Sequence, residues 1–383
     1  MPESQYVRED AQSDTRMDAR EEALVEKAAV RGEGVEPAGE SRALWFCAYT
    51  PLEVLDAAGL DPRRVTGAVE RLEEADVLLH PATCPFVRAC LVEGMAERPR
   101  GPAFFVNSCD AMRRLHDAWR AEVCGAGGQD VEERPPVYIT DMPRRPGPKA
   151  ERRLAAEFLR LAEELERDGA RKVTAGALRE AAALRSEVAR RFLQWGEGLA
   201  GSSRLLLAEA AQALPPSRFL QGPPKGLAEG RGVPLLLTGN LLNPHGLVRV
   251  IEEAGGWVRA ADLCNGDRAF LDLGEVEGDT LEEAALSLAR RYLNRRGCAR
   301  MDDSRRRGFR LLEMARDCGA RGVIFASLKF CDPYLYDWPW LEALLRSEGM
   351  PALRLESDFR DGHAGQLSTR IEAFLEMLRE GDR

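Results

Sequence analysis

Several cysteines of this 383-residue chain follow apolar runs of strand character. One such run begins at Gly322 and leads to Cys331. We expect a buried parallel strand there, and open α/β sheets bind ligands just beyond the carboxyl ends of such strands. Three runs upstream, Ala43–Cys47, Val77–Cys84 and Ala103–Cys109, end in the same way. Four strand-end cysteines are hard to explain as unrelated core residues, so the sequence predicts a set of functional thiolates.

Two further loop cysteines lie in the second half of the chain. Cys264 follows a predicted strand, and Cys298 lies among cationic side chains in a loop after a predicted helix. Cations beside a thiol lower its pKa or offset the negative charge of a cluster. The other three cysteines have simpler explanations, because Cys90 and Cys318 fit helix packing and Cys124 lies in a glycine-rich loop.

The loop cysteines predict a metal centre. We expect a cytoplasmic chain whose thiols stay reduced, which disfavours disulfides and leaves iron–sulfur ligation, zinc, catalysis or plain burial. Thiolates tens of residues apart, with no CxxC or HExxH spacing, favour an iron–sulfur cluster over zinc and over a zinc or thiol hydrolase. The candidate ligands are Cys47, Cys84, Cys109, Cys264, Cys298 and Cys331.

Polar residues at the predicted strand ends are candidates for substrate contacts. Thr238 and Asn240 flank a glycine in a strand-to-helix loop that is able to cradle an anion, although a structural turn is the better explanation. Ser327, Lys329 and Asp332 surround the turn after the last apolar run. A packing or capping role explains each of the five at least as well.

Local signals predict where two helices begin near these cysteines. Thr50 is expected to be an N-cap with Pro51 at the first helical position, and Glu53 completes the pattern of a capping box. Pro85 fits the first position of a helix that carries Cys90. Free N–H groups at a helix amino terminus stabilise a thiolate nearby.

The length and the pattern of the chain indicate two α/β domains. Strand, turn and helix alternate in each of them, and the second repeats the plan of the first. A long stretch rich in Ala, Leu, Glu and Arg predicts helices between the two domains. The predicted parts are a flexible leader (1–40), a first α/β domain (41–147), a helical segment with a linker (148–231) and a second α/β domain (232–383).

The composition excludes some partners. A formal net charge of -9 and a pI near 5.3 argue against nucleic-acid binding, which needs a basic face. No run of 18 apolar residues and no signal-like leader is present, so neither a membrane nor a secretory route is expected. We expect the protein to be cytoplasmic.

Five stretches of the sequence carry motifs of a known family. They are Trp45–Gly59, Val106–Leu115, Ala261–Arg268, Lys329–Pro333 and Gly365–Leu378. These stretches resemble the subunits of 2-hydroxyacyl-CoA dehydratases and benzoyl-CoA reductases, a family that also includes the double-cubane cluster proteins. The resemblance covers about residues 43 to 380.

The resemblance implies two Rossmann-like (flavodoxin-like) parallel-sheet domains, an inserted helical segment and an iron–sulfur cluster in the cleft between the domains. It implies electrons delivered one at a time by a separate ATP-hydrolysing iron–sulfur activator. In the dehydratases two paralogous subunits form a heterodimer, each with a [4Fe-4S] cluster, and act on a 2-hydroxyacyl-CoA. In the double-cubane proteins a homodimer carries eight-iron clusters, each bound by cysteines of one chain, and reduces small molecules.

The choice between these two types stays open from the sequence. Six loop cysteines in both halves fit the double-cubane arrangement, but Arg300 stands where that type is expected to have a second cysteine in the Cys298 loop. The motif that begins at Trp45 suits the dehydratases. A non-catalytic partner, which carries a cluster while a paralogous subunit binds substrate, is a further alternative.

Overall fold

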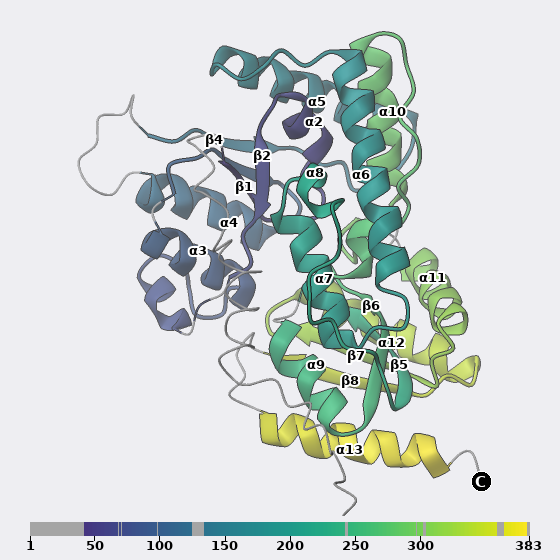
Figure 1. Ribbon diagram of the computed structural model, residues 1–383. Helices are drawn as coiled ribbons and strands as arrows, with labels where there is room; N and C mark the ends of the chain where they lie inside the picture. Colours follow the sequence, from purple (N-terminus) through teal and green to yellow (C-terminus); the bar gives the residue numbers. More distant parts are fainter. Residues whose placement is uncertain are drawn as a thin grey trace, which may run out of the picture. The chain divides into compact units, whose positions relative to one another are not determined.

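The computed structural model describes residues 42–380 with gaps at 68, 70, 98, 125–133, 242–243, 296, 302–303 and 358–363. The predicted leader, residues 1–40, lies outside the described residues. Within them the chain forms two separate four-stranded sheets (Figure 1). All strand pairs in both sheets are parallel, which confirms the predicted α/β class with two Rossmann-like parallel sheets.

The first sheet has the strand order β2-β1-β3-β4. Its strands are β1 (Arg42–Trp45), β2 (Asp61–Arg64), β3 (Ala103–Val106) and β4 (Val137–Thr140). Alternate side chains of β3 are buried on opposite faces, as the two-residue period of a strand requires. Phe105 packs on one face with Leu115, and Phe104 packs on the other face with Phe158 and Tyr292.

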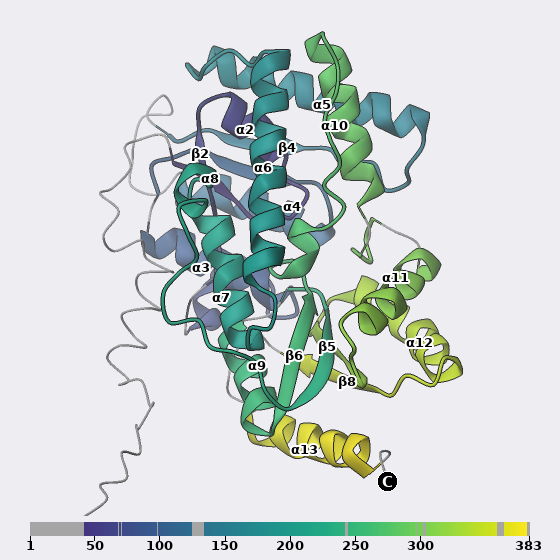
Figure 2. The same cartoon turned by 45° about the vertical axis from the view of Figure 1, so that its right-hand side comes forward.

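Helices cover both faces of the first sheet. One face carries α3 (Pro85–Glu97), α4 (Asp110–Ala118) and the π-helical turn Trp119–Val123. The other face carries α2 (Leu52–Ala57), α5 (Pro148–Arg167) and α10 (Leu281–Asn294). Although α10 comes late in the sequence, it lies beside α5 and α6 (Ala175–Trp195) (Figure 2). The second half of the chain therefore contributes to the core around the first sheet.

The second sheet repeats the strand order of the first as β6-β5-β7-β8. Its strands are β5 (Val233–Gly239), β6 (Gly256–Asp262), β7 (Gly322–Leu328) and β8 (Ala352–Ser357). All seven residues of β7 are buried, which confirms the predicted buried strand before Cys331. One face of the sheet carries α9 (Pro244–Glu253) and α13 (Ala364–Glu380), and the other carries α11 (Ser304–Asp317) and α12 (Asp332–Ser347).

The segment between the sheets is helical, as predicted. It consists of α5, α6, α7 (Gly201–Ala213) and the short α8 (Pro216–Phe219). Helix α7 contacts β2 of the first sheet and β6 of the second sheet, so it links the two (Figure 1). None of the helices that the structure describes is long and apolar enough to cross a membrane.

One predicted strand is wrong. The run Val77–Cys84 is not extended, because a 3-10 helix (Leu72–Val77) precedes an irregular segment that reaches Cys84. The side chains of Val77 and Leu78 are 79% and 37% exposed. A run with only one buried apolar side chain, Leu79, cannot serve as a strand covered on both faces.

Candidate functional site

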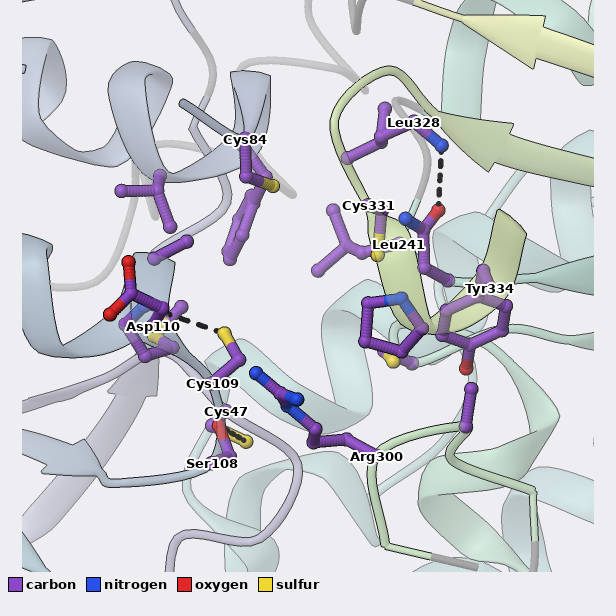
Figure 3. Close-up of a pocket in the computed structure, with 18 of the residues that line it drawn as sticks. Cys47, Cys84, Ser108, Cys109, Asp110, Leu241, Arg300, Leu328, Cys331 and Tyr334 are labelled. Atoms are coloured by element: carbon purple, nitrogen blue, oxygen red, sulfur yellow. Dashed lines mark hydrogen bonds between the residues drawn. The ribbon is translucent and has the colours of Figure 1, made fainter. Parts of the chain in front are cut away.

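A cavity of about 1060 Å³ collects the predicted cysteines. Its walls come from the loops after β1, β3, β5, β6 and β7, together with the segment before α3 and the loop after α10. All six candidate ligands line it, from both halves of the chain: Cys47, Cys84, Cys109, Cys264, Cys298 and Cys331. In the close-up the labelled cysteines surround an open space into which Arg300 extends (Figure 3). The structure therefore brings together thiols that are up to 284 positions apart in the sequence.

The other three cysteines lie elsewhere. Cys90, Cys124 and Cys318 are not among the described residues that line the cavity. Cys90 is fully buried in α3 and Cys124 is buried after the π-helical turn, both within the core of the first sheet. Cys318 lies at the end of α11 beside the core of the second sheet. Their placement agrees with the packing roles predicted for Cys90 and Cys318.

Three of the cavity cysteines stand at the amino termini of helices. Cys109 is the N-cap residue of α4, and its sulfur accepts a hydrogen bond of 3.4 Å from the backbone N–H of Met112. Cys84 directly precedes α3, and Cys331 is the N-cap residue of α12. The exposed N–H groups and the dipole of a helix start favour a negatively charged sulfur there. We call these three the helix-capped group: Cys84, Cys109 and Cys331.

The remaining three cysteines lie in loops beside arginines, of which Arg64 and Arg268 are buried. Arg268 donates a hydrogen bond of 3.5 Å to the Cys264 sulfur, and Arg64 donates one of 2.7 Å to the Cys264 carbonyl oxygen. Arg295, which follows α10, donates one of 2.8 Å to the carbonyl oxygen of Ala48, next to Cys47. A buried guanidinium fixes several acceptors at once and offsets negative charge. We call these three the arginine-lined group: Cys47, Cys264 and Cys298.

Burial dominates the acid–base behaviour of these thiols. It raises the pKa of Cys47 and Cys331 to about 11 and that of Cys84 and Cys298 to about 12. Neighbouring thiolates raise these pKa values further, whereas hydrogen bonds from backbone and side chains lower them. These four thiols therefore hold their protons unless a cation takes their place.

The thiolates interact mainly within their own group. Charge on Cys331 and on Cys109 raises the pKa of Cys84, and charge on Cys109 raises that of Cys331. In the other group, charge on Cys264 and on Cys47 raises the pKa of Cys298. Coupling also crosses between the groups, because charge on Cys109 raises the pKa of Cys47 and charge on Cys264 raises that of Cys331. Charge coupling therefore connects all six thiols, with more of it within each group than between the groups.

No preformed group of metal ligands is present in the part of the chain that the structure describes. No three His, Cys, Asp or Glu side chains there come close enough to hold one metal ion. A zinc site needs three or four protein ligands around one ion.

Contacts between distant parts of the sequence hold the loops of Cys47 and Cys298. The Tyr292 hydroxyl of α10 lies 2.7 Å from Glu53 Oε2 and 2.8 Å from the Thr50 carbonyl oxygen, and it accepts a 3.3 Å hydrogen bond from Leu52 N–H. Arg291 Nη2 lies 2.9 Å from Glu53 Oε1, and both side chains are buried. Helix α2, which follows Cys47, is thereby tied to α10, which precedes Cys298.

The predicted capping box at the start of α2 is not formed. The helix begins at Leu52 with Pro51 as its N-cap residue, and no side chain caps it. The physical reason is that the Glu53 carboxylate faces the buried Arg291 and the Tyr292 hydroxyl. A buried cation attracts a carboxylate more strongly than a backbone N–H at a helix start does.

Of the five predicted substrate contacts, two line the cavity and three do not. Asn240 and Asp332 line the cavity. Thr238 is buried and donates a hydrogen bond of 2.8 Å to Asp262 Oδ2, and Ser327 is fully buried in β7. Neither these two nor Lys329 is among the described lining residues.

Several residues of the cavity wall were not predicted from the sequence. Tyr49 is 5% exposed, and Arg64 and Arg268 are also buried. Burial raises the pKa of the Tyr49 phenol, which therefore stays protonated as a hydrogen-bond donor. Tyr49 and Arg268 lie inside two of the family-like stretches, so those stretches held the signal. Arg64 ends β2, whose sequence Asp-Pro-Arg-Arg has no strand pattern.

Comparisons with known proteins cover most of the chain. The protein is 26% identical over 364 residues to YjiM of Escherichia coli (strain K12), a provisionally named dehydratase subunit. The alignment covers 87% of this chain and 90% of YjiM. It is 24% identical over 350 residues to the (R)-phenyllactyl-CoA dehydratase beta subunit of Clostridium sporogenes (86% and 90%). It is 26% identical over 354 residues to a benzoyl-CoA reductase subunit of Thauera aromatica (86% and 89%).

These relatives are named as dehydratases and a reductase, which confirms the expected resemblance and an enzyme of the 2-hydroxyacyl-CoA dehydratase-like kind. The family model described as "2-hydroxyglutaryl-CoA dehydratase, D-component" matches residues 47–378, which include the loops of all six cavity cysteines. The chain therefore belongs to the 2-hydroxyglutaryl-CoA dehydratase D-component family.

Proposed function

We propose that this chain is an iron–sulfur subunit that takes low-potential electrons, one at a time, from a separate ATP-hydrolysing activator. It uses them for the reductive dehydration of a 2-hydroxyacyl-CoA or for the reduction of a related substrate. The observation that carries the proposal is the convergence of six thiols, from loops of both sheets, on one cavity. Membership of a family whose relatives are named as dehydratases and a reductase supports the reaction type.

The residues of the cavity fit an iron–sulfur cluster. Cysteine thiolates are its usual ligands, with about four for a [4Fe-4S] cluster. A cluster is larger than a single ion, so its cysteine ligands need not lie as close together as those of one metal ion. The guanidinium groups of Arg268 and Arg295 offset the negative charge of bound thiolates. When bound, such a cluster supplies single electrons at low potential.

The side chains around the thiols have their own part in this proposal. Tyr49, whose phenol stays protonated, offers a hydrogen bond to a substrate oxygen in the cavity. His80 is exposed at the cavity wall, and its Nδ1 accepts a hydrogen bond of 3.1 Å from the backbone N–H of Ala82. This bond places the proton of the neutral ring on Nε2, where it is available for exchange with substrate or solvent.

An eight-iron double-cubane reductase of small molecules is the second candidate. The observation that favours it is the number of thiols in the cavity, because six cysteines line it and one four-iron cluster takes about four ligands. Arg300 is the departure that counts against it, since its side chain extends into the cavity where a further cysteine was expected (Figure 3). The iron content per chain separates the two candidates.

The decisive experiment is anaerobic purification with an iron supply, followed by iron and sulfide quantification and electron paramagnetic resonance. We expect a brown protein with about four irons per chain for the first candidate and about eight for the second. A colourless, iron-free protein would contradict both candidates. Activity is then measured with reduced activator and ATP on a panel of 2-hydroxyacyl-CoA thioesters and on small molecules such as acetylene.

We also propose that the chain works as a dimer. The names of two relatives, a dehydratase beta subunit and a benzoyl-CoA reductase subunit, describe proteins that have partner subunits. A paralogous subunit is therefore the expected partner for the dehydratase, and a second copy of this chain for the double-cubane reductase. The mass of the purified, active species distinguishes the two, and an active monomer would contradict both.

A further inference from the structure

Tyr334 joins the segments of three cavity cysteines. It lies in the first turn of α12, and its backbone N–H donates a hydrogen bond of 3.1 Å to the carbonyl oxygen of Cys331, the N-cap residue. Its side chain is 3% exposed and stands on the side of the cavity that also carries Cys331 (Figure 3). A buried hydroxyl has to find its hydrogen-bond partners inside the protein. The partners of Tyr334 come from the segments of two other cysteines.

The first partner is Arg268, in the segment of Cys264. Arg268 Nη1 donates a hydrogen bond of 2.5 Å to the Tyr334 hydroxyl and one of 3.5 Å to the Cys264 sulfur. Nε and Nη2 of the same guanidinium group each donate a hydrogen bond of 2.9 Å to a different carboxylate oxygen of Asp262. A guanidinium that is paired in this bidentate way has a fixed orientation. Arg268 therefore connects the Tyr334 hydroxyl to the Cys264 thiol through one rigid group.

The second partner is the main chain directly before Cys298. The Tyr334 hydroxyl donates a hydrogen bond of 3.4 Å to the Gly297 carbonyl oxygen, which also accepts one of 3.1 Å from Arg307 Nε. Gly297 has a φ of +116°, and a Cβ atom there would lie 2.7 Å from Arg268 Nε. Glycine alone combines this backbone conformation with so close an approach. The chain before Cys298 therefore packs on the same guanidinium group that Tyr334 contacts.

A hydroxyl suits both partners of Tyr334. It accepts a hydrogen bond from Arg268, whose side chain only donates, and it donates one to the Gly297 carbonyl oxygen, which only accepts. Phenylalanine at this position keeps the ring, which packs with Phe325 and Trp338, and removes the hydroxyl alone. The hydrogen bonds of Tyr334 can therefore be removed without leaving a cavity in the core.

We propose that Tyr334 is a positioning residue whose hydroxyl fixes the Cys298 segment against Cys264 and Cys331, and thereby determines how firmly the bound metal centre is retained. The effect on metal retention rests on the proposed iron–sulfur function, whereas the positioning of Cys298 does not. Partners that hold metal-ligating side chains in place strengthen metal binding about ten- to hundredfold. The loss of one hydrogen bond shifts a local opening equilibrium about two- to tenfold.

The first test is thiol labelling of the iron-free chain with iodoacetamide under anaerobic conditions, followed by mass spectrometry that resolves each cysteine. In Tyr334→Phe we expect Cys298 to react about two- to tenfold faster than in the wild-type protein, because its segment opens more often. Cys84 and Cys109 should react at their wild-type rates, since their segments take no part in these hydrogen bonds. Circular dichroism checks that the variant is folded.

The second test measures iron retention in protein that is purified anaerobically with its iron. We expect Tyr334→Phe to lose iron at about ten- to hundredfold lower chelator concentration than the wild-type protein. Tyr138→Phe is the matched control. Tyr138 of β4 is also buried and donates a hydrogen bond from its hydroxyl to Asp168, but it is not among the described residues that line the cavity. This control should keep the wild-type labelling rates and iron retention.

The outcomes separate this inference from the proposed function. Faster labelling of every cysteine in Tyr334→Phe, or the same changes in Tyr138→Phe, would mean a general loosening and would overturn the specific role of Tyr334. Wild-type labelling of Cys298 would overturn the positioning role, and wild-type iron retention would overturn the effect on the metal centre; both leave the proposed function intact. An iron-free wild-type protein would overturn the proposed function, while the labelling rates would still decide whether Tyr334 positions Cys298.

Discussion

The two groups of thiols reach the same cavity by different means. Each member of the helix-capped group stands next to the start of its own helix, and for Cys109 the capping bond joins residues three positions apart. The loops of the arginine-lined group are held across the sequence. Arg64 and Cys264 are 200 positions apart, and Arg295 and Ala48 are 247 apart. One group is built by local structure and the other by tertiary contacts.

The groups also differ in how they stabilise negative charge. Helix starts offer N–H groups and partial charges, which act only within the first turn. Arginines offer full positive charges, and their burial makes them costly without partners. Arg268 illustrates this, because it contacts Asp262, the Cys264 sulfur and the Gly239 carbonyl oxygen at once. The arginine-lined group should therefore respond more strongly to the loss of a single distant residue.

The largest effect is expected from removal of a whole group. Serine at all three positions of either group takes away the thiolates that soft metal ions prefer. We expect each triple variant to lose at least about half of the bound iron while it stays folded. Anaerobic iron analysis and circular dichroism measure both properties. The variants are Cys84→Ser/Cys109→Ser/Cys331→Ser and Cys47→Ser/Cys264→Ser/Cys298→Ser.

The amount of iron that each triple variant retains shows whether the two groups of cysteines act separately or together. If about half of the iron stays in each triple variant, the groups hold separate parts of the centre; if all of it is lost from both, they act as one site. Wild-type iron content in either variant would remove that group from the metal site. Cys90→Ser/Cys318→Ser is the control, because these two cysteines lie outside the described wall of the cavity.

The next effect concerns the tie between the loops of Cys47 and Cys298. Glu53→Gln leaves the buried Arg291 without its counter-charge, which costs roughly 3–5 kcal/mol of unfolding free energy. Denaturant unfolding measures this loss of unfolding free energy. The control is Glu151→Gln, whose partner Arg290 neighbours Arg291 but is exposed. That exposed pair is expected to contribute less than about 1 kcal/mol. Equal losses in the two variants would contradict the importance of the buried tie.

The same pair gives a pH dependence. Burial, the largest single cause, would raise the pKa of the Glu53 carboxyl. The Arg291 and Arg295 guanidinium groups and the hydrogen bond with Tyr292 together outweigh it, so the pKa lies below its ordinary value of 4.5. A lowered pKa means that the stabilisation is complete above the ordinary value and is lost as the pH falls through the folded-state value. The stability difference between the wild-type protein and Glu53→Gln should therefore shrink below pH 4.5. A stability difference that grows below pH 4.5 would contradict a lowered pKa of Glu53.

The smallest effect is local. Cys109→Ala removes the N-cap of α4 and is expected to lower the unfolding free energy by about 1 kcal/mol. Cys109→Ser keeps a capping atom and should retain that stability, although both variants lose the thiol. Urea unfolding of the iron-free chains measures the difference. Equal stability of the two variants would show that capping does not hold this cysteine.

The sequence predicted much of the fold and the six cysteines that line the cavity. The buried strand before Cys331 was readable because it is a continuous apolar run, and the helix after Cys84 was readable from Pro85. The strand expected over Val77–Cys84 was wrong, because apolar identity does not reveal exposure. Strand β2 was missed, since Asp-Pro-Arg-Arg becomes a strand only by pairing with β1.

By itself, the sequence determined which cysteines are candidates for chemistry and where several local elements start. Cysteines after apolar runs, and helix signals such as Pro85, are properties of neighbouring residues. Only the tertiary structure decided the grouping of the six thiols, the burial of Arg64 and Arg268 beside them, and the use of Glu53 in a buried ion pair instead of a capping box. The physical reason is that burial and charge pairing depend on residues hundreds of positions away, which no local pattern records.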